Sequence, residues 1–270
     1  MIGKFGKTST YIKNCETMLK FNLIFTLFLF LSVSIGCASE NETVHKEMIS
    51  ESAENSVLVF SKTAGFRHDS IEEGAEAVKK LGEEHGFNVT WTEDSSYFTT
   101  VNLSNYDAII FMNTTMTVFD DSQKAAFKEY IQSGGGFVGV HSATDTEYDW
   151  PWYGEMVGAY FMNHPPVLPA VVEVVDSNHP STAHLPERWE RTDEWYNFKN
   201  LNENVNVLLK LDTGSFEGSE HPGNHPIAWY HEYDGGRAFY TGLGHTKETY
   251  VEENFLLHLL GGIRYAMGIE

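Results

Sequence analysis

Apolar and polar positions along the chain predict strands and helices in alternation. Residues 57–60 and 108–112 are short apolar runs, and residues 87–91 alternate between apolar and polar side chains. Each length suits a strand. Two helical patterns lie among these runs: one with Ile71, Ala75, Val78 and Leu81 at helical spacing, and one, capped by Asp120 or Asp121, with Phe127, Tyr130 and Ile131 on one face. Runs that are apolar on both faces favour a parallel sheet covered by helices, so the N-terminal half predicts a doubly wound α/β sheet.

The second half is less regular. Strands are predicted at residues 171–175, 205–209, 227–230 and 237–240, and Asp234-Gly235-Gly236 predicts a hairpin turn between the last two. A closing helix carries Val251, Phe255, Leu256, Leu259 and Ile263 on the side that would pack on the sheet. We therefore expect antiparallel strands added to the mostly parallel sheet.

A targeting segment precedes the predicted domain. Lys20 is followed by apolar residues 21–35 and by Cys37, the layout of a bacterial lipoprotein signal, in which Cys37 is lipidated. The alternative, a membrane-spanning anchor, is disfavoured because roughly 15 apolar residues are fewer than the ~20 that a spanning helix needs. We thus expect a signal peptide at residues 1–36, with Met18 as a possible true start, a flexible tether at 37–55 and one domain at 56–270, held at the cell envelope, periplasmic or at the outer membrane.

Cysteine content and charge exclude several classes of function. The chain has 2 cysteines, Cys15 and Cys37, so the predicted domain has neither a disulfide nor a thiol nucleophile, and any metal must be held by histidine and carboxylate. The formal net charge is −20, and it becomes −23 without residues 1–36, which hold four lysines and one acid. Such a surface repels phosphate backbones, so a nucleic-acid partner is not expected.

The most informative segment is Gly136-Phe137-Val138-Gly139-Val140-His141-Ser142, a buried strand that runs directly into a polar pair. In open α/β sheets, ligands bind outside the carboxyl ends of the strands. The residues that follow the predicted strands include Arg67 and His68, Asn113, His141 and Ser142, and His245; His164, the segment Asp193-Glu194-Trp195-Tyr196 and the pair His221 and His225 could join them. Three histidines from separate segments therefore predict one site.

Six motifs in order give the chain a resemblance to a known family. They are Phe66-Arg67-His68, Gly134 to His141, Asn178-His179-Pro180, Asp193-Glu194-Trp195-Tyr196, His225-Pro226-Ile227-Ala228-Trp229 and Gly235 to His245. Together they resemble the ThuA-like (trehalose utilisation) family over about residues 56–268. The resemblance implies a flavodoxin-like fold similar to that of class I glutamine amidotransferases, and sugar catabolism beside oxidoreductases that make 3-keto sugars.

Glutamine hydrolysis itself is rejected. In amidotransferases a nucleophilic cysteine occupies the turn that corresponds here to His141, and imidazole cannot replace thiolate in that reaction. Ser142 lacks the Gly-x-Ser-x-Gly elbow of an esterase.

Histidine can instead move protons near neutrality or bind a divalent ion. The leading hypothesis is a lyase, hydrolase or isomerase step on a 3-keto glycoside, in which the ketone acidifies the neighbouring C–H. His141 and Glu194 would be base or metal ligand, and His245 and His68 acid, ligand or oxyanion partner. Substrate would be held by Arg67, Asn113, Ser142, Trp195, Trp229 and His164. A Zn²⁺ or Mn²⁺ ion on His141, His245 and Glu194 stays open, and so does a non-catalytic sugar-binding or scaffold lipoprotein.

Overall fold

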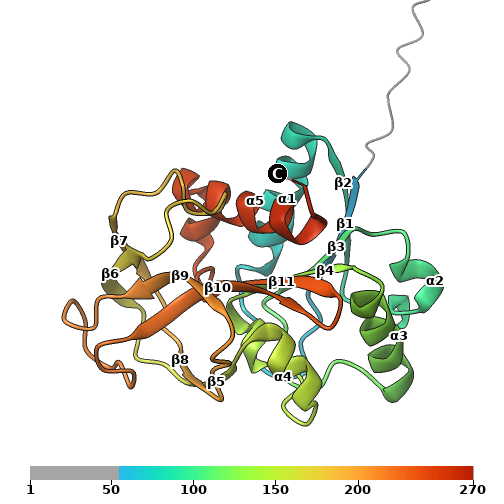
Figure 1. The fold of residues 1–270 in the computed structure, drawn as a ribbon, viewed down its shortest axis with the longest axis horizontal. Helices are drawn as coiled ribbons and strands as arrows, with labels where there is room; N and C mark the ends of the chain where they lie inside the picture. Colours follow the sequence, from blue (N-terminus) through green and yellow to red (C-terminus); the bar gives the residue numbers. More distant parts are fainter. Residues whose placement is uncertain (1–54, 270) are drawn as a thin grey trace, which may run out of the picture. The chain divides into compact units, whose positions relative to one another are not determined.

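The computed structural model describes residues 55–269, in which a nine-stranded sheet carries helices on both faces (Figure 1). The strands are β1 (Asn55–Phe60), β2 (Phe87–Thr92), β3 (Ala108–Met112), β4 (Gly136–Val140), β5 (Tyr160–Asn163), β6 (Leu168–Val174), β7 (Arg188–Asp193), β8 (Asn197–Lys199), β9 (Asn206–Leu211), β10 (His225–Tyr233) and β11 (Gly236–Thr241). The helices are α1 (Ile71–His85), α2 (Thr100–Leu103), α3 (Asp121–Gln132), α4 (Pro151–Val157) and α5 (Glu253–Met267), with 3₁₀ turns η1 (Ser95–Tyr97), η2 (His141–Asp145) and η3 (Lys247–Val251).

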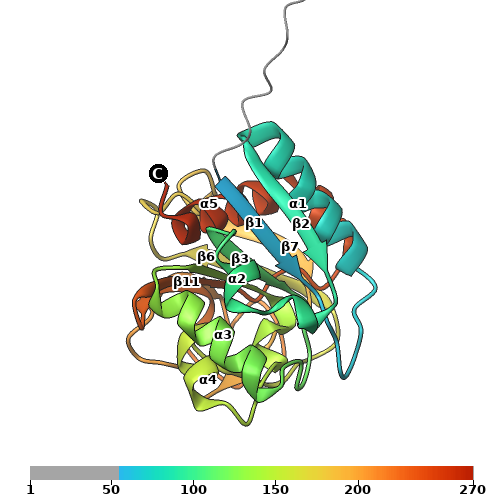
Figure 2. The same cartoon turned by 90° about the vertical axis from the view of Figure 1, so that its right-hand side faces the viewer.

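The sheet has a parallel part and an antiparallel part, in the order β2-β1-β3-β4-β11-β10-β9-β6-β7. Strands β2, β1, β3, β4 and β11 are parallel to one another, and every pairing from β11 to β7 is antiparallel. Helices α1 and α5 lie on one face, and α3 and α4 on the other, in both views (Figures 1 and 2). The predicted fold class is confirmed, with β5 and β8 as a separate two-stranded sheet.

Helices α1 and α3 lie where the sequence predicts. The closing helix α5 begins only at Glu253, so Val251, which was expected on its packed side, lies in η3 and is 82% exposed. Asp120 caps α3, and its carboxylate accepts from the backbone N–H of Gln123 while the Gln123 side chain accepts from the Asp120 N–H. Helix α1 buries the predicted apolar stripe and ends at Gly86, which takes φ 79°. Strands β1, β3 and β4 are almost wholly buried, so their carboxyl ends are fixed relative to one another.

Gly134, Gly135 and Gly136, around the start of β4, are glycine for different structural reasons. Gly134 takes φ 99°, a conformation that favours glycine. At Gly135 a Cβ would lie 2.4 Å from the Tyr130 ring, and at Gly136 it would lie 2.2 Å from the Ala266 carbonyl oxygen. Close packing of α3 and α5 therefore requires two of these glycines, and backbone conformation requires the third.

Five elements were not predicted from the sequence: α2, α4, β5, β7 and β8. The predicted signal peptide, the lipidation of Cys37 and the tether up to residue 54 lie outside the described residues. Asn55, the last residue of the predicted tether, is the first residue of β1 and pairs with Phe87 of β2. Along residues 55–269, no helix is long and apolar enough to cross a membrane.

Candidate functional site

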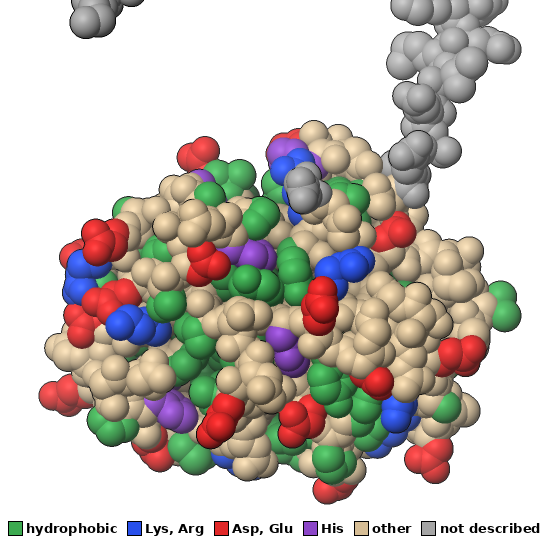
Figure 3. Space-filling model, viewed as in Figure 1, with side chains coloured by type: hydrophobic (Ala, Val, Ile, Leu, Met, Phe, Trp, Pro, Cys, Tyr) green, Lys and Arg blue, Asp and Glu red, His purple; other side chains and the backbone are tan. Residues whose placement is uncertain are grey.

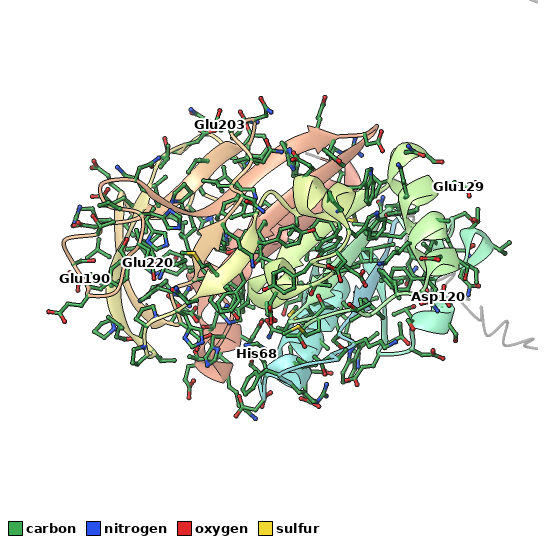
Figure 4. All side chains as sticks on the ribbon, turned by 90° about the horizontal axis from the view of Figure 1, so that it is seen from below. His68, Asp120, Glu129, Glu190, Glu203 and Glu220 are labelled. Carbon is green, nitrogen blue, oxygen red and sulfur yellow. The ribbon has the colours of Figure 1, made fainter. Side chains whose placement is uncertain are left out.

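Four side chains from separate segments meet at the carboxyl ends of the parallel strands. His68 follows β1 (Figure 4), His141 follows β4, His245 follows β11, and Glu194 follows β7 from the antiparallel part of the sheet. Each offers one ligand-type atom, and these four atoms all lie within 4.8 Å of one another. The three histidines that the sequence places after separate strands therefore lie close together in the structure.

Three of the four groups form a compact triangle. His141 Nε2 lies 3.2 Å from His245 Nδ1. The Glu194 Oε2 atom lies 3.4 Å from His141 Nε2 and 3.2 Å from His245 Nδ1. The second carboxylate oxygen, Oε1, is 3.0 Å from His164 Nδ1. Both carboxylate oxygens of Glu194 therefore contact imidazole rings.

The orientation of His141 is fixed from behind. Its Nδ1 donates to the Gly242 carbonyl at 3.0 Å, which points Nε2 at the triangle. The residue takes φ 49°, a left-handed conformation that is uncommon outside glycine. Its carbonyl accepts from the Tyr240 hydroxyl at 2.8 Å, and its ring lies 4.2 Å from the Tyr196 ring. The backbone turn after β4 therefore aims this imidazole into the cluster.

Asp193 ties the segments of Glu194 and His245 together. Its buried carboxylate accepts from the backbone N–H groups of Glu194, Gly244 and His245 at 3.0–3.1 Å. It also accepts from the buried Arg191 guanidinium at 2.9 Å. One carboxylate thereby fixes two of the four cluster residues through their main chain.

The environments of the cluster residues push their pKa values apart. Burial acts to raise the pKa of Glu194, but hydrogen bonds from His141 and His245 outweigh burial and lower it. Burial acts to lower the pKa of His245, but the hydrogen bond to Glu194 outweighs burial and raises it. Burial, reinforced by the nearby His141 and His245, lowers the pKa of His68 to about 2. The site thus favours an ionised Glu194 and a neutral His68 at neutral pH, and it shifts His245 toward its protonated form.

A pocket of 290 Å³ opens onto this cluster. The pocket is lined by aromatic and ionisable side chains. The aromatic ones are Phe66, Phe161 and Tyr196, and the ionisable ones are His68, His164, His245, Glu194 and Asp145. Phe66 is 67% exposed at the pocket, whereas Tyr196 is buried. The volume lies just below the range typical of small-molecule sites, so the pocket suits one small ring rather than an extended chain.

Asp145 is a pocket residue that sequence reasoning missed. It is the last residue of η2, the 3₁₀ turn that starts at His141, and it accepts a short hydrogen bond from the Tyr148 hydroxyl. Burial raises the pKa of Asp145, and this hydrogen bond offsets the rise only in part. The sequence could have indicated Asp145 as a pocket residue, because it lies four residues after His141 and a short helical turn brings residues three or four apart to the same side.

Only some of the predicted substrate-binding residues lie at or near the pocket. His164 lines the pocket, and Ser142 Oγ lies 3.4 Å from His68 Nδ1. Asn113 is buried at the end of β3 and donates to the Ser70 hydroxyl. Arg67 points to the surface, where it pairs with Glu72 and Glu93. Arg67 and Asn113 therefore do not line the pocket.

The expectation that Trp195 and Trp229 hold a sugar is corrected by the structure. Both indoles are core residues, 0% and 1% exposed. The Trp195 indole N–H donates to the Leu168 carbonyl and the Trp229 N–H to the Val157 carbonyl. Neither ring faces the pocket. His221 and His225 also stay outside it, bonded to the main chain at Phe198 and Tyr196.

Comparison with known proteins agrees with this architecture. The family described as ThuA, trehalose utilisation, matches residues 56–266. The chain belongs to the ThuA family. A solved ThuA-like protein from Bacteroides uniformis ATCC 8492 is 25% identical with a TM-score of 0.69, over 80% of this chain and 93% of that one. A second, from Parabacteroides merdae ATCC 43184, is 20% identical with a TM-score of 0.65, over 80% and 91% of the two chains.

More distant solved structures share only the fold of this ThuA protein. A β-galactosidase from Bacillus circulans sp. alkalophilus is 14% identical with a TM-score of 0.52, and the match covers 81% of this chain and 32% of that one. No curated protein sequence matches the chain.

Proposed function

We propose that this protein acts on an oxidised glycoside, a sugar with a ketone at C3, and cleaves its glycosidic bond by elimination. Membership of the trehalose utilisation family supports a carbohydrate substrate. The observation that carries the proposal is the convergence of acid–base groups of different pKa on one pocket with aromatic walls. Aromatic faces suit the C–H faces of a sugar ring, and the ionisable groups suit proton transfer.

In the proposed step, Asp145 is the base. The C3 ketone acidifies the C2–H bond, and the Asp145 carboxylate takes that proton. The electron pair of the C–H bond moves to the ketone oxygen and forms an enolate. A raised pKa makes Asp145 a stronger base than an exposed carboxylate, and it is the one acidic group in the lining outside the four-residue cluster.

The cluster stabilises the enolate. Glu194 favours the protonated form of His245, and in that form its positive charge and N–H groups lie beside the pocket where the oxyanion forms. When the enolate collapses, the C1–O bond breaks, and the protonated Asp145 returns its proton to the departing oxygen. The products are an unsaturated keto sugar and the free alcohol, with no net gain or loss of protons.

The substrate must come from another reaction. A hydroxyl at C3 becomes a ketone only by oxidation, so a sugar oxidoreductase has to precede this protein in the reaction sequence. The small-molecule partner is therefore a glycoside or disaccharide already oxidised at C3.

The test is incubation with 3-keto-trehalose and a 3-keto-glucoside, followed by mass spectrometry. We expect the wild type to release the alcohol or sugar, and Asp145→Asn, which keeps the shape but removes the base, to lower kcat by about 10²- to 10⁴-fold. His85→Ala is the matched control, because His85 is exposed at the far end of α1.

Two results would count against this proposal. A wild type that binds the keto sugars without converting them favours a non-catalytic sugar-binding lipoprotein. An Asp145→Asn variant with wild-type kcat removes Asp145 from the mechanism.

We also propose that the chain is a lipoprotein of the cell envelope, attached to the membrane through lipid on Cys37. The support is sequence pattern alone: Lys20, the apolar residues 21–35 and a small residue before the cysteine.

A further inference from the structure

We infer that His68, His141, His245 and Glu194 form a binding site for a divalent first-row transition metal ion, with Zn²⁺ as the preferred occupant. The inference concerns which ion these four side chains hold, and a bound ion would replace the proton on His245 as the positive charge beside the pocket. Its basis is their spacing, their chemistry and the contacts that fix them.

The spacing matches a coordination shell. In a tetrahedral zinc site with bonds of about 2.0–2.1 Å, neighbouring ligand atoms lie roughly 3.3–3.4 Å apart. The three distances among His141 Nε2, His245 Nδ1 and Glu194 Oε2 are 3.2, 3.4 and 3.2 Å. His68 completes the set within 4.8 Å. An ion placed at equal distance from these three atoms would thus have three ligands in position, and a small movement of the His68 side chain would supply the fourth.

The donor set selects the class of ion. Three imidazole nitrogens and one carboxylate oxygen suit Zn²⁺ and its first-row neighbours, whereas Mg²⁺ and Ca²⁺ prefer oxygen ligands throughout. The described residues that line the pocket include no lysine or arginine, so no built-in cation competes for the position.

Contacts behind the ligands fit a metal site as well. His141 donates Nδ1–H to a backbone carbonyl, the usual way in which a ligating histidine is oriented. His164 holds the free oxygen of Glu194, and the Asp193 carboxylate holds the main chain of Glu194 and His245. Ligands are therefore held in place by partners that do not themselves point at the ion.

The position is also accessible. His68, Glu194 and His245 line the pocket, while His141 is 0% exposed behind them. An ion at this point would lie at the pocket's floor, with one side toward any molecule that enters.

The alternative is a metal-free cluster in which Glu194 is hydrogen-bonded to His141 and His245. Cobalt distinguishes the two, because four-coordinate Co²⁺ gives strong visible absorption bands. The full chain, purified without a histidine tag and treated with a chelator, is titrated with Co²⁺. We expect one tightly bound ion per chain, its bands abolished by Zn²⁺ and unaffected by Mg²⁺.

Variants test the ligand assignment. His141→Ala and Glu194→Gln should weaken Co²⁺ binding by about 100-fold or more, and His164→Ala, which removes only an outer partner, by about 10-fold. His85→Ala should bind as the wild type does. Thermal unfolding adds a second readout: Zn²⁺ should raise the Tm of the wild type and of His85→Ala but not of Glu194→Gln, which also shows whether each variant is folded.

Wild-type protein that binds Co²⁺ no more tightly than folded Glu194→Gln overturns the inference. So does a Zn²⁺-dependent rise in Tm that is equal in all variants. These results are read without any sugar, so metal binding with no turnover of 3-keto glycosides contradicts the proposed reaction alone, and turnover with no metal binding contradicts this site alone.

Discussion

At the scale of single residues, the site depends on groups that do not enter the pocket. Asp193 accepts three backbone N–H groups and faces Arg191, and the side chains of this pair are 0% and 3% exposed. The buried charge of each is compensated by the other. The buried pair of Asp193 and Arg191 therefore both positions Glu194 and His245 and stabilises this part of the fold.

Asp193→Asn should unfold more easily than the wild type by about 3–5 kcal/mol, because it removes the nearest counter-charge of the buried Arg191, whose other ion-pair partner, Glu252, is 3.4 Å away. Urea unfolding followed by circular dichroism measures the difference. The control is Arg188→Ala, which removes an exposed arginine that pairs with Glu173 and Asp212 and should cost less than about 1 kcal/mol. Equal costs for the two substitutions would contradict the role given to Asp193.

His258, in α5, predicts how stability depends on pH. Burial lowers its pKa to about 3, and its Nδ1 lies 2.9 Å from the Ser181 carbonyl. In the unfolded chain a histidine titrates at about 6.5. Between these two values the unfolded state binds a proton that the folded state does not, so stability is present above pH 6.5 and is lost as the pH falls toward 3.

Each such histidine changes the unfolding free energy by about 1.4 kcal/mol per pH unit in this window. Replacing His258 with glutamine should therefore make the loss between pH 6.5 and 5 smaller by about 2 kcal/mol, whatever the variant's stability at pH 7. Urea unfolding at several pH values gives the slope. His85→Gln, on the surface, should leave the slope unchanged, and a His258→Gln slope equal to that of the wild type would show that His258 does not titrate in this way.

At the scale of elements, sequence reasoning worked best where one pattern decides the structure. Strands β1, β3 and β4 are apolar on both faces, and α1 and α3 carry clear caps and stripes. The hairpin between β10 and β11 turns at Asp234 and Gly235, both at positive φ as the sequence predicts. Local chemistry was enough for these elements.

The missed elements lack such a signal. Strand β7, Arg188–Asp193, alternates in burial, but four of its six residues are charged, and its inward face includes Arg191 and Asp193. Its position becomes favourable only when the two charges pair. Strands β5 and β8 have four and three residues, too few for periodicity to show.

Helix α5 contacts its neighbours so closely that two of its residues must be glycine. A Cβ at Gly261 would lie 2.4 Å from the Ser181 backbone, and one at Gly262 would lie 2.3 Å from the Phe239 ring. Helix propensity alone would favour alanine by about 1 kcal/mol. The packing of α5 overrides that preference.

Gly261→Ala should therefore destabilise the protein, by up to about 2 kcal/mol, because the cost of the backbone clash exceeds the gain in propensity. Thermal unfolding measures the change, with Glu253→Ala, an exposed substitution in the first turn of α5, as a near-neutral control. A Gly261→Ala protein as stable as the wild type would mean that α5 lies further from the Ser181 segment than described.

For the whole molecule, the convergence of the histidines follows from topology. Parallel strands end at one edge of the sheet, which brings these residues together. Acidic side chains are scattered over the face shown in Figure 3. Which aromatic residues face the pocket could not be predicted. Within residues 193–196, Glu194 and Tyr196 line the pocket, whereas Asp193 and Trp195 point into the core. Neighbouring residues in extended backbone face opposite sides, and the sequence alone does not tell which side faces the pocket.

The last prediction concerns the attachment of the whole chain to a membrane. Cys37 lies outside the described residues, and the proposed lipoprotein is attached through lipid on this cysteine. Wild-type protein, produced in a bacterium that acylates lipoproteins and grown with radioactive fatty acid, should carry label and sediment with membranes. Cys37→Ala should lose both properties, because the thiol that accepts the lipid is gone. Cys15→Ala is the matched control and should keep them, whether translation begins at Met1 or at Met18. Equal labelling of the wild type and Cys37→Ala would refute the assignment.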